Sequence, residues 1–158
     1  MPSDALPSAG VRFPPPLIYA LGLVATYLIN RAVPLWLAHP EPRWLWRLGV
    51  VVAVAGVSLS LFGVATFRRH RTSVNPTKPS SVIVTTGPYA FTRNPMYLGL
   101  AVFYAGVGLL LDTWWAFITL PMVVVAVDRA VIRREERYLA SAFGKEYEAF
   151  RAKTRRWL

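Results

Sequence analysis

Long uncharged stretches alternate with short charged ones along this chain. Residues 48–67 and 95–111 carry no charged side chain, and residues 113–130 carry none before Asp128. An α-helix rises about 1.5 Å per residue, so about 20 apolar residues cross the roughly 30 Å hydrocarbon layer of a membrane. The pattern therefore predicts spanning helices at about 14–36, 48–67, 95–111 and 113–130. The first is the weakest, because Asn30 and Arg31 interrupt it.

The segments between and after these spans complete one predicted domain over residues 1–158. A loop at 68–94 and C-terminal helices at 131–157 are expected on the same side of the membrane, and no cleavage motif follows the first apolar segment. Small residues spaced by three and four, namely Ala53, Gly56, Ser60 and Gly63, favour close packing of the second span on a neighbour. The predicted fold class is therefore all-α: a membrane bundle of about four helices.

Charge gives the predicted bundle an orientation. The net charge is +10, and all but three of the 18 lysine and arginine residues lie before the first span, in 68–94 or from Asp128 onward; the exceptions are Arg31, Arg43 and Arg47. The positive-inside rule then places both termini in the cytoplasm. Attraction to anionic lipid and topology account for the basic excess, so we expect no nucleic-acid partner.

Few residue types suited to metal binding are present. The chain has no cysteine and two histidines, His39 and His70. We therefore expect no metal site and no cysteine nucleophile.

The loop at 68–94 ends in a turn followed by a helix start. Gly87-Pro88 is a turn signal, and Asn94-Pro95 suits an N-cap followed by the first helical residue. The N-terminus of such a helix carries partial positive charge and favours anions. The third span is thus expected to open with a surface suited to a carboxylate or phosphate.

The tail carries a carboxylate on an apolar face. Ile132, Glu136, Leu139 and Phe143 recur at helical spacing, with Glu135 at the edge of that face and a break expected at Gly144. A carboxylate held against a bundle needs a cationic partner, either an arginine of the protein or a ligand.

Packing of the spans should gather six side chains at the cytoplasmic surface: Tyr89, Arg93, Asn94, Tyr97, Glu135 and Glu136. One interpretation is a pocket with an anion site, a carboxylate and aromatic walls. The other is structural: Arg93 pairs with Glu136, Asn94 only caps the helix, and the tyrosines anchor at the membrane interface.

Several spaced motifs resemble one family of membrane enzymes. The elements are Gly87-Pro88-Tyr89, Arg93-Asn94-Pro95, Tyr97 and Gly99, then Arg134-Glu135-Glu136, Leu139, Phe143-Gly144 and Tyr147. In this order they resemble the isoprenylcysteine carboxyl methyltransferases and phospholipid methyltransferases. The resemblance covers about residues 68–157.

That resemblance implies an integral membrane methyltransferase, in the inner membrane of a bacterium, that uses S-adenosylmethionine. A cytoplasmic C-terminal helix would close the cofactor pocket, and a lipophilic small molecule or lipidated substrate would enter from the bilayer. The implied catalytic residues are Arg93, Glu135 and Glu136. The implied cofactor-binding residues are Gly87, Tyr89, Asn94, Pro95, Tyr97, Gly99 and Glu136.

One position departs from the family: Asn94 stands where the family has a histidine. Asparagine donates hydrogen bonds but does not carry protons near neutral pH, so a histidine base is not available there. A carboxylate acceptor would call for the cation of Arg93, whereas an amine or hydroxyl would call for Glu135 or Glu136 as base.

Two other functions remain compatible with the sequence. A membrane reductase related to the sterol reductases would bind NADPH, and a non-catalytic adaptor would use its basic tail on anionic lipid. The methyl acceptor and the oligomeric state are left open.

Overall fold

The structure is a computed structural model that describes residues 14–40, 42–70 and 82–157. Most of the first part of the predicted 68–94 loop, residues 71–81, lies outside the described residues. The helices are α1 (Pro15–Ala32), α2 (Arg43–Arg69), the 3-10 turn η1 (Gly87–Ala90), α3 (Pro95–Leu110), α4 (Trp115–Val127), the π-helical η2 (Asp128–Ile132), α5 (Arg133–Phe143) and α6 (Lys145–Lys153). The described residues contain isolated bridges but no strand, which confirms the all-α class.

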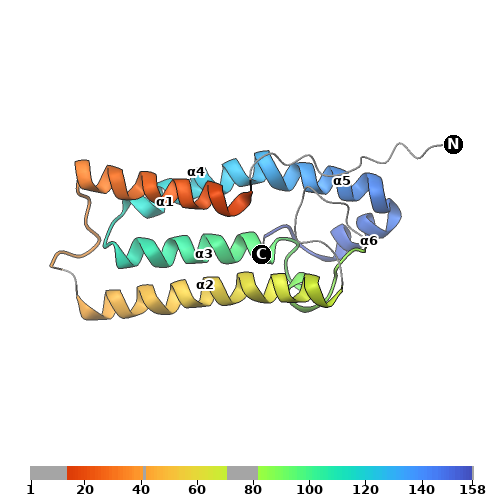
Figure 1. The fold of residues 1–158 in the computed structure, drawn as a ribbon, viewed down its shortest axis with the longest axis horizontal. Coiled ribbons are helices and arrows are strands. Elements are labelled where there is room, and N and C mark those ends of the chain that lie inside the picture. The colour runs from red at the N-terminus through yellow and green to blue at the C-terminus, as the bar shows by residue number, and fades with distance from the viewer. Residues whose placement is uncertain (1–13, 41, 71–81, 158) are drawn as a thin grey trace.

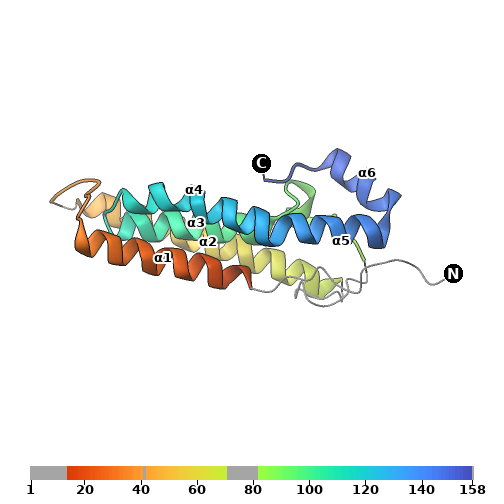
Figure 2. The same ribbon diagram turned by 90° about the horizontal axis from the view of Figure 1, so that it is seen from above.

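The helices form an elongated bundle in which α1 to α4 lie side by side (Figures 1 and 2). α4 continues through η2 into α5 as one helix, Trp115–Phe143. Its α5 part extends beyond the start of α3, and α6 folds back from it at Gly144, where φ is +50°. The predicted break at Gly144 is confirmed. The basic end of α2, the start of α3 and the C-terminal helices thus share one end of the bundle.

Glycines bring α2 and α3 into direct backbone contact. A β-carbon at Gly56 would fall against the backbone nitrogen of Phe103, and one at Gly106 against the backbone of Ala53. Ser60 uses the same proximity to donate a hydrogen bond to the Met96 carbonyl at 2.9 Å. The predicted small-residue face of the second span is therefore a helix contact.

Replacing Gly56 with alanine should destabilise the bundle by about 1–3 kcal/mol, because a backbone on the opposite helix cannot move aside as a side chain does. Thermal unfolding in detergent measures the effect. Ala55→Leu, on the exposed side of α2, is the matched control and should leave the midpoint within a degree or two of wild type. Equal midpoints for Gly56→Ala and wild type would contradict the described contact.

Hydroxyl groups join the helices inside the bundle. The Thr26, Tyr104 and Thr119 hydroxyls lie within 2.6–2.8 Å of one another, linking α1, α3 and α4. Tyr19 donates to the Tyr97 carbonyl at 3.0 Å. Hydrogen bonds of this kind hold helices together where apolar burial gives little discrimination between protein and lipid.

The opposite end of the bundle is closed by short connections. α1 runs through Asn30 and Arg31, and the Asn30 Oδ1 accepts a hydrogen bond from Thr113 at 2.9 Å. Asp112 turns the chain between α3 and α4 with φ of +47° and accepts from the Ala38 amide at 2.9 Å. An apolar cavity of about 320 Å³ lies at this end, lined by residues that include Leu37, Leu109 and Trp114.

Length and composition identify two candidate membrane spans among the described residues, Arg43–Arg69 and Trp115–Phe143, while Pro95–Leu110 is apolar but shorter. Large apolar side chains are exposed at helical spacing. The exposed sets are Leu17, Leu21, Val24 and Leu28 on α1, Val51, Val54 and Leu61 on α2, and Ile118, Met122 and Val125 on α4. Such stripes are unusual for a protein surrounded by water. They are the surfaces expected of helices that face lipid.

Candidate functional site

The candidate site lies where α2 ends and α3 begins, beneath α5 and α6. Gly87 starts η1 with φ of +61°, a conformation that side chains with a β-carbon rarely adopt, and a β-carbon there would meet the Thr66 hydroxyl at 3.1 Å. The next turn buries Tyr89, whose ring centroid lies 5.0 Å from that of Phe67. This turn brings the loop back onto α2 just before Arg93.

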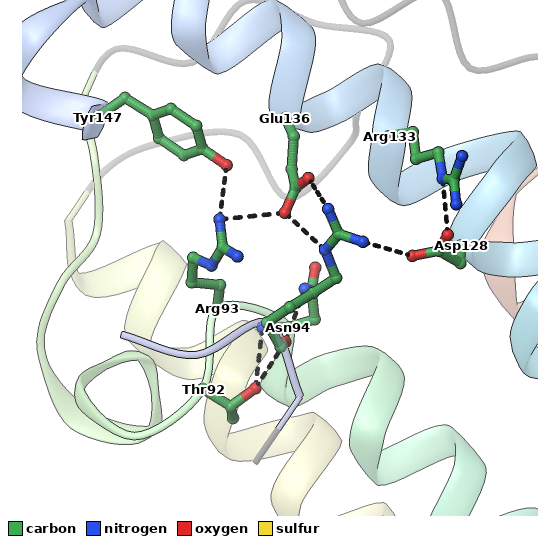
Figure 3. Close-up of polar contacts among 8 residues, drawn as sticks. Thr92, Arg93, Asn94, Asp128, Arg133, Glu136 and Tyr147 are labelled. Atoms are coloured by element: carbon green, nitrogen blue, oxygen red, sulfur yellow. Dashed lines mark hydrogen bonds and ion pairs between the residues drawn. The ribbon is translucent and has the colours of Figure 1, made fainter. Parts of the chain in front are cut away.

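Arg93 and Glu136 form a nearly buried ion pair at the centre of the site. The Arg93 Nη1 lies 3.1 Å from the Glu136 Oε1, with side-chain exposures of 11% and 17%. The same guanidinium donates to the Tyr147 hydroxyl of α6 at 3.3 Å (Figure 3). The cation that the carboxylate required is therefore a residue of the chain itself.

A second guanidinium, that of Arg156, contacts the same carboxylate. Its Nε donates to the Glu136 Oε1 at 3.0 Å and its Nη2 to the Oε2 at 2.5 Å, while its Nη1 lies 3.2 Å from the Asp128 Oδ1. The hydrogen bond to Glu136 is the main cause that raises the pKa of Arg156 above its usual value, so the residue stays cationic. Glu136 thus lies between two arginines.

Residues 154–157, which we call the C-terminal clasp, lie along the start of α3. Thr92 and Arg155 form a bridge, and the Arg93 amide donates to the Arg155 carbonyl at 2.9 Å. The Thr92 hydroxyl and the Asn94 Nδ2 both donate to the Arg156 carbonyl, at 3.1 and 2.9 Å. The clasp is therefore held to the loop by main-chain atoms, which leaves the Arg156 side chain to reach Glu136.

The predicted capping role of Asn94 is wrong in one respect. Asn94 precedes α3 and Pro95 is its first residue, as expected, but the Asn94 side chain makes no capping hydrogen bond. It bonds to the clasp, and the Thr92 hydroxyl accepts from the Asn94 amide instead, at 3.2 Å. Asn94 acts here as a donor.

Glu135 forms a separate pair with Tyr97. The Tyr97 hydroxyl donates to the Glu135 Oε1 at 2.6 Å. The uncharged run of α4 ends at Val127, whereas α5 is rich in charged residues, so Glu135 lies outside the apolar part of the long helix. Burial raises the pKa of Glu135 from 4.5 to about 7, the Tyr97 hydrogen bond lowers it in part, and the neighbouring Glu136 raises it. A carboxyl group with this pKa exchanges protons near neutral pH.

Two polar atoms at the site are buried without a hydrogen-bond partner within the described part of the chain: the Tyr89 hydroxyl and the Arg93 Nε. Burial, and secondarily Glu135, raises the pKa of Tyr89, so its hydroxyl remains a donor. Unsatisfied buried donors are costly in a native fold. A polar ligand with oxygen acceptors would satisfy both donors.

The other predicted residues differ in where they lie. Pro95 is buried at the start of α3, and Gly87 forms the turn that supports Tyr89. Gly99 faces α2, where a β-carbon would meet Ser60. Its position explains helix packing rather than contact with a cofactor.

Four residues at the site were not predicted as site residues: Thr92, Asp128, Tyr147 and Arg156. Tyr147 lies within the quoted motif, and the presence of an aromatic residue on a charged helix is the sequence signal that could have identified it. In the structure its side chain is only 2% exposed. Arg156 follows the last helix in an irregular segment, where no periodicity marks a face. Only the neighbouring Trp157, an aromatic residue in a basic tail, marks that segment as packed; it contacts the core.

The family model of the phospholipid methyltransferases matches residues 44–146. The matched segment contains α2 apart from its first residue, together with α3, α4 and α5, and it includes the four site residues Arg93, Tyr97, Glu135 and Glu136. It ends before the C-terminal clasp.

Three curated proteins show the range of similarity. A cobalt-zinc-cadmium resistance protein, CzcN, of Cupriavidus metallidurans is 28% identical over 103 residues, which is 65% of this chain and 46% of that protein. A protein-S-isoprenylcysteine O-methyltransferase of Schizosaccharomyces pombe is 35% identical over 72 residues, 46% of this chain and 30% of that enzyme. An uncharacterized protein of Haemophilus influenzae is 36% identical over 63 residues, 40% of this chain and all of that protein. No solved structure matches the chain significantly.

Proposed function

Since the chain belongs to the phospholipid methyltransferase family, we propose that it transfers a methyl group from S-adenosylmethionine to a lipid-like or membrane-associated acceptor. The matches cover less than half of the length of the two named relatives. The proposed activity is therefore argued from the site of this chain as well as from the family. The observation that carries the proposal is the juxtaposition of a buried Arg93–Glu136 pair and a Tyr97–Glu135 pair within the matched segment.

The bundle suits reaction at a membrane surface. We propose that α1 to α4 cross the bilayer as four spans of a single domain, with both chain ends and the site on the cytoplasmic side of a bacterial inner membrane. Exposed apolar stripes on α1, α2 and α4 support this arrangement, as do the basic residues at the end of α2 and in α5 and α6. A water-soluble cofactor and a lipid acceptor would then meet at the boundary between the two phases.

Arg93, Glu136 and Tyr89 are the residues proposed to hold the cofactor. The Arg93 Nε and the Tyr89 hydroxyl are donors for its carboxylate or ribose oxygens, and Glu136 is the acceptor for its ammonium group or ribose hydroxyls. When bound, S-adenosylmethionine would supply an electrophilic methyl group on a sulfonium. The leaving group is a neutral thioether, so it requires no proton. The protein therefore contributes mainly positioning and exclusion of water.

Glu135 is the residue that adapts the site to its acceptor. If the acceptor is an amine or a hydroxyl, the Glu135 carboxylate is placed to take its proton, with Tyr97 holding the side chain at 2.6 Å. If the acceptor is a carboxylate, no base is needed and Arg93 is the cation that would orient it. Asn94, bonded to the clasp, takes no part in proton transfer in either case.

Isothermal titration of the detergent-purified protein with S-adenosylhomocysteine tests the proposal. We expect saturable binding in the range of about 1 μM to 1 mM that is typical of enzyme ligands. A parallel titration with NADPH should show no binding. A reductase would instead bind NADPH in preference to S-adenosylhomocysteine. Absence of S-adenosylhomocysteine binding at millimolar ligand would rule out the proposed function.

A further inference from the structure

We propose that Arg156 is a positioning residue of this site, and that Asn94 contributes to cofactor binding by holding Arg156 in place. The inference rests on the proposed function, and it links Asn94 to Arg156, which lies beyond the segment that matches the family, since that segment ends at residue 146. It assigns a role to the C-terminal clasp and to Asn94.

The first observation is how Arg156 ties the elements of the site together. Its guanidinium contacts Glu136 on α5 and Asp128 on η2, two turns apart on the same helix, and its carbonyl accepts from Asn94 at the start of α3. One residue therefore connects the loop, α3 and the long α4–α5 helix. Its side chain is 33% exposed, against 11% for Arg93, so it covers the inner pair from the solvent side.

The second observation is the effect of Arg156 on the geometry of Glu136. Arg93 alone makes one contact with the Oε1, which leaves the carboxylate free to rotate. Arg156 contacts both oxygens at once, and such a bidentate pair fixes the plane of a carboxylate. Arg156 thereby sets which way Glu136 presents its remaining acceptor sites to a ligand.

The third observation links Asn94 to this arrangement. The Asn94 Nδ2 and the Thr92 hydroxyl bind the same Arg156 carbonyl, so the main chain of the clasp is fixed directly beneath the guanidinium. Thr154 is buried at 6% exposure and Trp157 packs against the core on either side. The side-chain donor of Asn94 therefore fixes the position of the Arg156 main chain, from which the Arg156 side chain extends to Glu136.

A double-mutant cycle with S-adenosylhomocysteine as the ligand tests this coupling. Arg156→Ala should raise the dissociation constant about tenfold or more, a loss comparable to that of outer partners that orient metal ligands. Asn94→Ala should raise it by about threefold to tenfold. Because both act through the same contact, the double variant should bind no worse than Arg156→Ala alone.

Matched variants separate positioning from a general structural effect. Lys153→Ala removes an exposed cation from the end of α6, just before the clasp, and should bind as wild type does. Arg156→Lys keeps the charge but not the planar fork, so its affinity should lie between those of wild type and Arg156→Ala. Multiplicative effects in the cycle, or unchanged or tighter binding by Arg156→Ala, would overturn the inference; tighter binding would mean that the clasp blocks the site.

A second readout is independent of the cofactor. The Arg93 amide is bonded to the Arg155 carbonyl at 2.9 Å, so its hydrogen exchange reports whether the clasp stays in place. Asn94→Ala should accelerate exchange in residues 92–94, and Lys153→Ala should not. If wild type failed to bind S-adenosylhomocysteine, the proposed function would be refuted, and unaccelerated exchange in Asn94→Ala would refute the clasp separately.

Discussion

Glu136→Ala should abolish both S-adenosylhomocysteine binding and methyl transfer, because Glu136 is the carboxylate on which Arg93 and Arg156 converge. Its loss leaves the Arg93 guanidinium, 11% exposed, without its counter-charge. Breaking a buried pair in this way typically costs about 3–5 kcal/mol of stability. Titration calorimetry and a methyl-transfer assay measure the binding and the turnover.

Two further variants distinguish lost chemistry from lost folding. Glu136→Gln keeps the shape and one acceptor oxygen, so it should fold and insert while binding the ligand far more weakly. Arg93→Ala should also abolish binding, since it removes the other half of the pair. Glu148→Ala, on the exposed face of α6, is the control carboxylate and should be fully active. Wild-type turnover in both Glu136→Gln and Arg93→Ala would refute the assigned site.

The stability of the protein should fall as the pH rises from about 4.5 to about 7, because of Glu135. Burial raises the pKa of this group from 4.5 to about 7 in the folded protein. Between these values the folded state retains a proton that the unfolded state has released, so deprotonation favours unfolding. A shift of this size corresponds to about 3 kcal/mol, present below the lower value and lost above the upper one.

Thermal unfolding in detergent from pH 4.5 to pH 8 measures this dependence. Glu135→Gln should remove the contribution and flatten the profile, while Glu146→Gln on the exposed face of α6 should leave it unchanged. Tyr97→Phe deletes the hydrogen bond that lowers the Glu135 pKa, so the fall in stability should continue to higher pH. A Glu135→Gln profile identical to that of wild type would show that this carboxyl group is not held as described.

Much of the site could be predicted because its residues lie on regular elements. The turn at Gly87 and the helix start at Pro95 fix where Arg93 and Tyr97 lie, and the period of the tail helix places two glutamates toward the bundle. The proximity of Arg93 and Tyr97 to the two glutamates then follows from the packing of the helices. The roles assigned to them in catalysis stay predictions.

The different partners of Glu135 and Glu136 were harder to predict. The spacing placed Glu136 on the apolar face and Glu135 at its edge. In the structure the buried face also includes Val131 and Tyr138, so it is wide enough for both carboxylates, and Glu135 meets Tyr97 while Glu136 meets the arginines. The position of one apolar stripe does not determine which of two adjacent glutamates contacts which partner.

The partner of Asn94 could not be predicted at all. A local reading assigns an asparagine before a proline to capping, because that hydrogen bond involves adjacent residues. The observed bond instead joins residues 62 positions apart, through an irregular segment after α6. Contacts of this kind depend on where the whole tail folds back, which no local pattern specifies.

The clasp also has a consequence for the order in which the protein is made. Synthesis delivers Arg93 well before Glu136, and Glu136 before Arg156, whereas contacts so distant in sequence form late in folding. Arg93 therefore has no counter-charge from Glu136 until the chain has been made at least as far as residue 136. The contact between α2 and α3 needs no residue of the tail, so it can form before the clasp is made. A chain that ended before residue 154 would keep the contact between α2 and α3 but would lack the clasp.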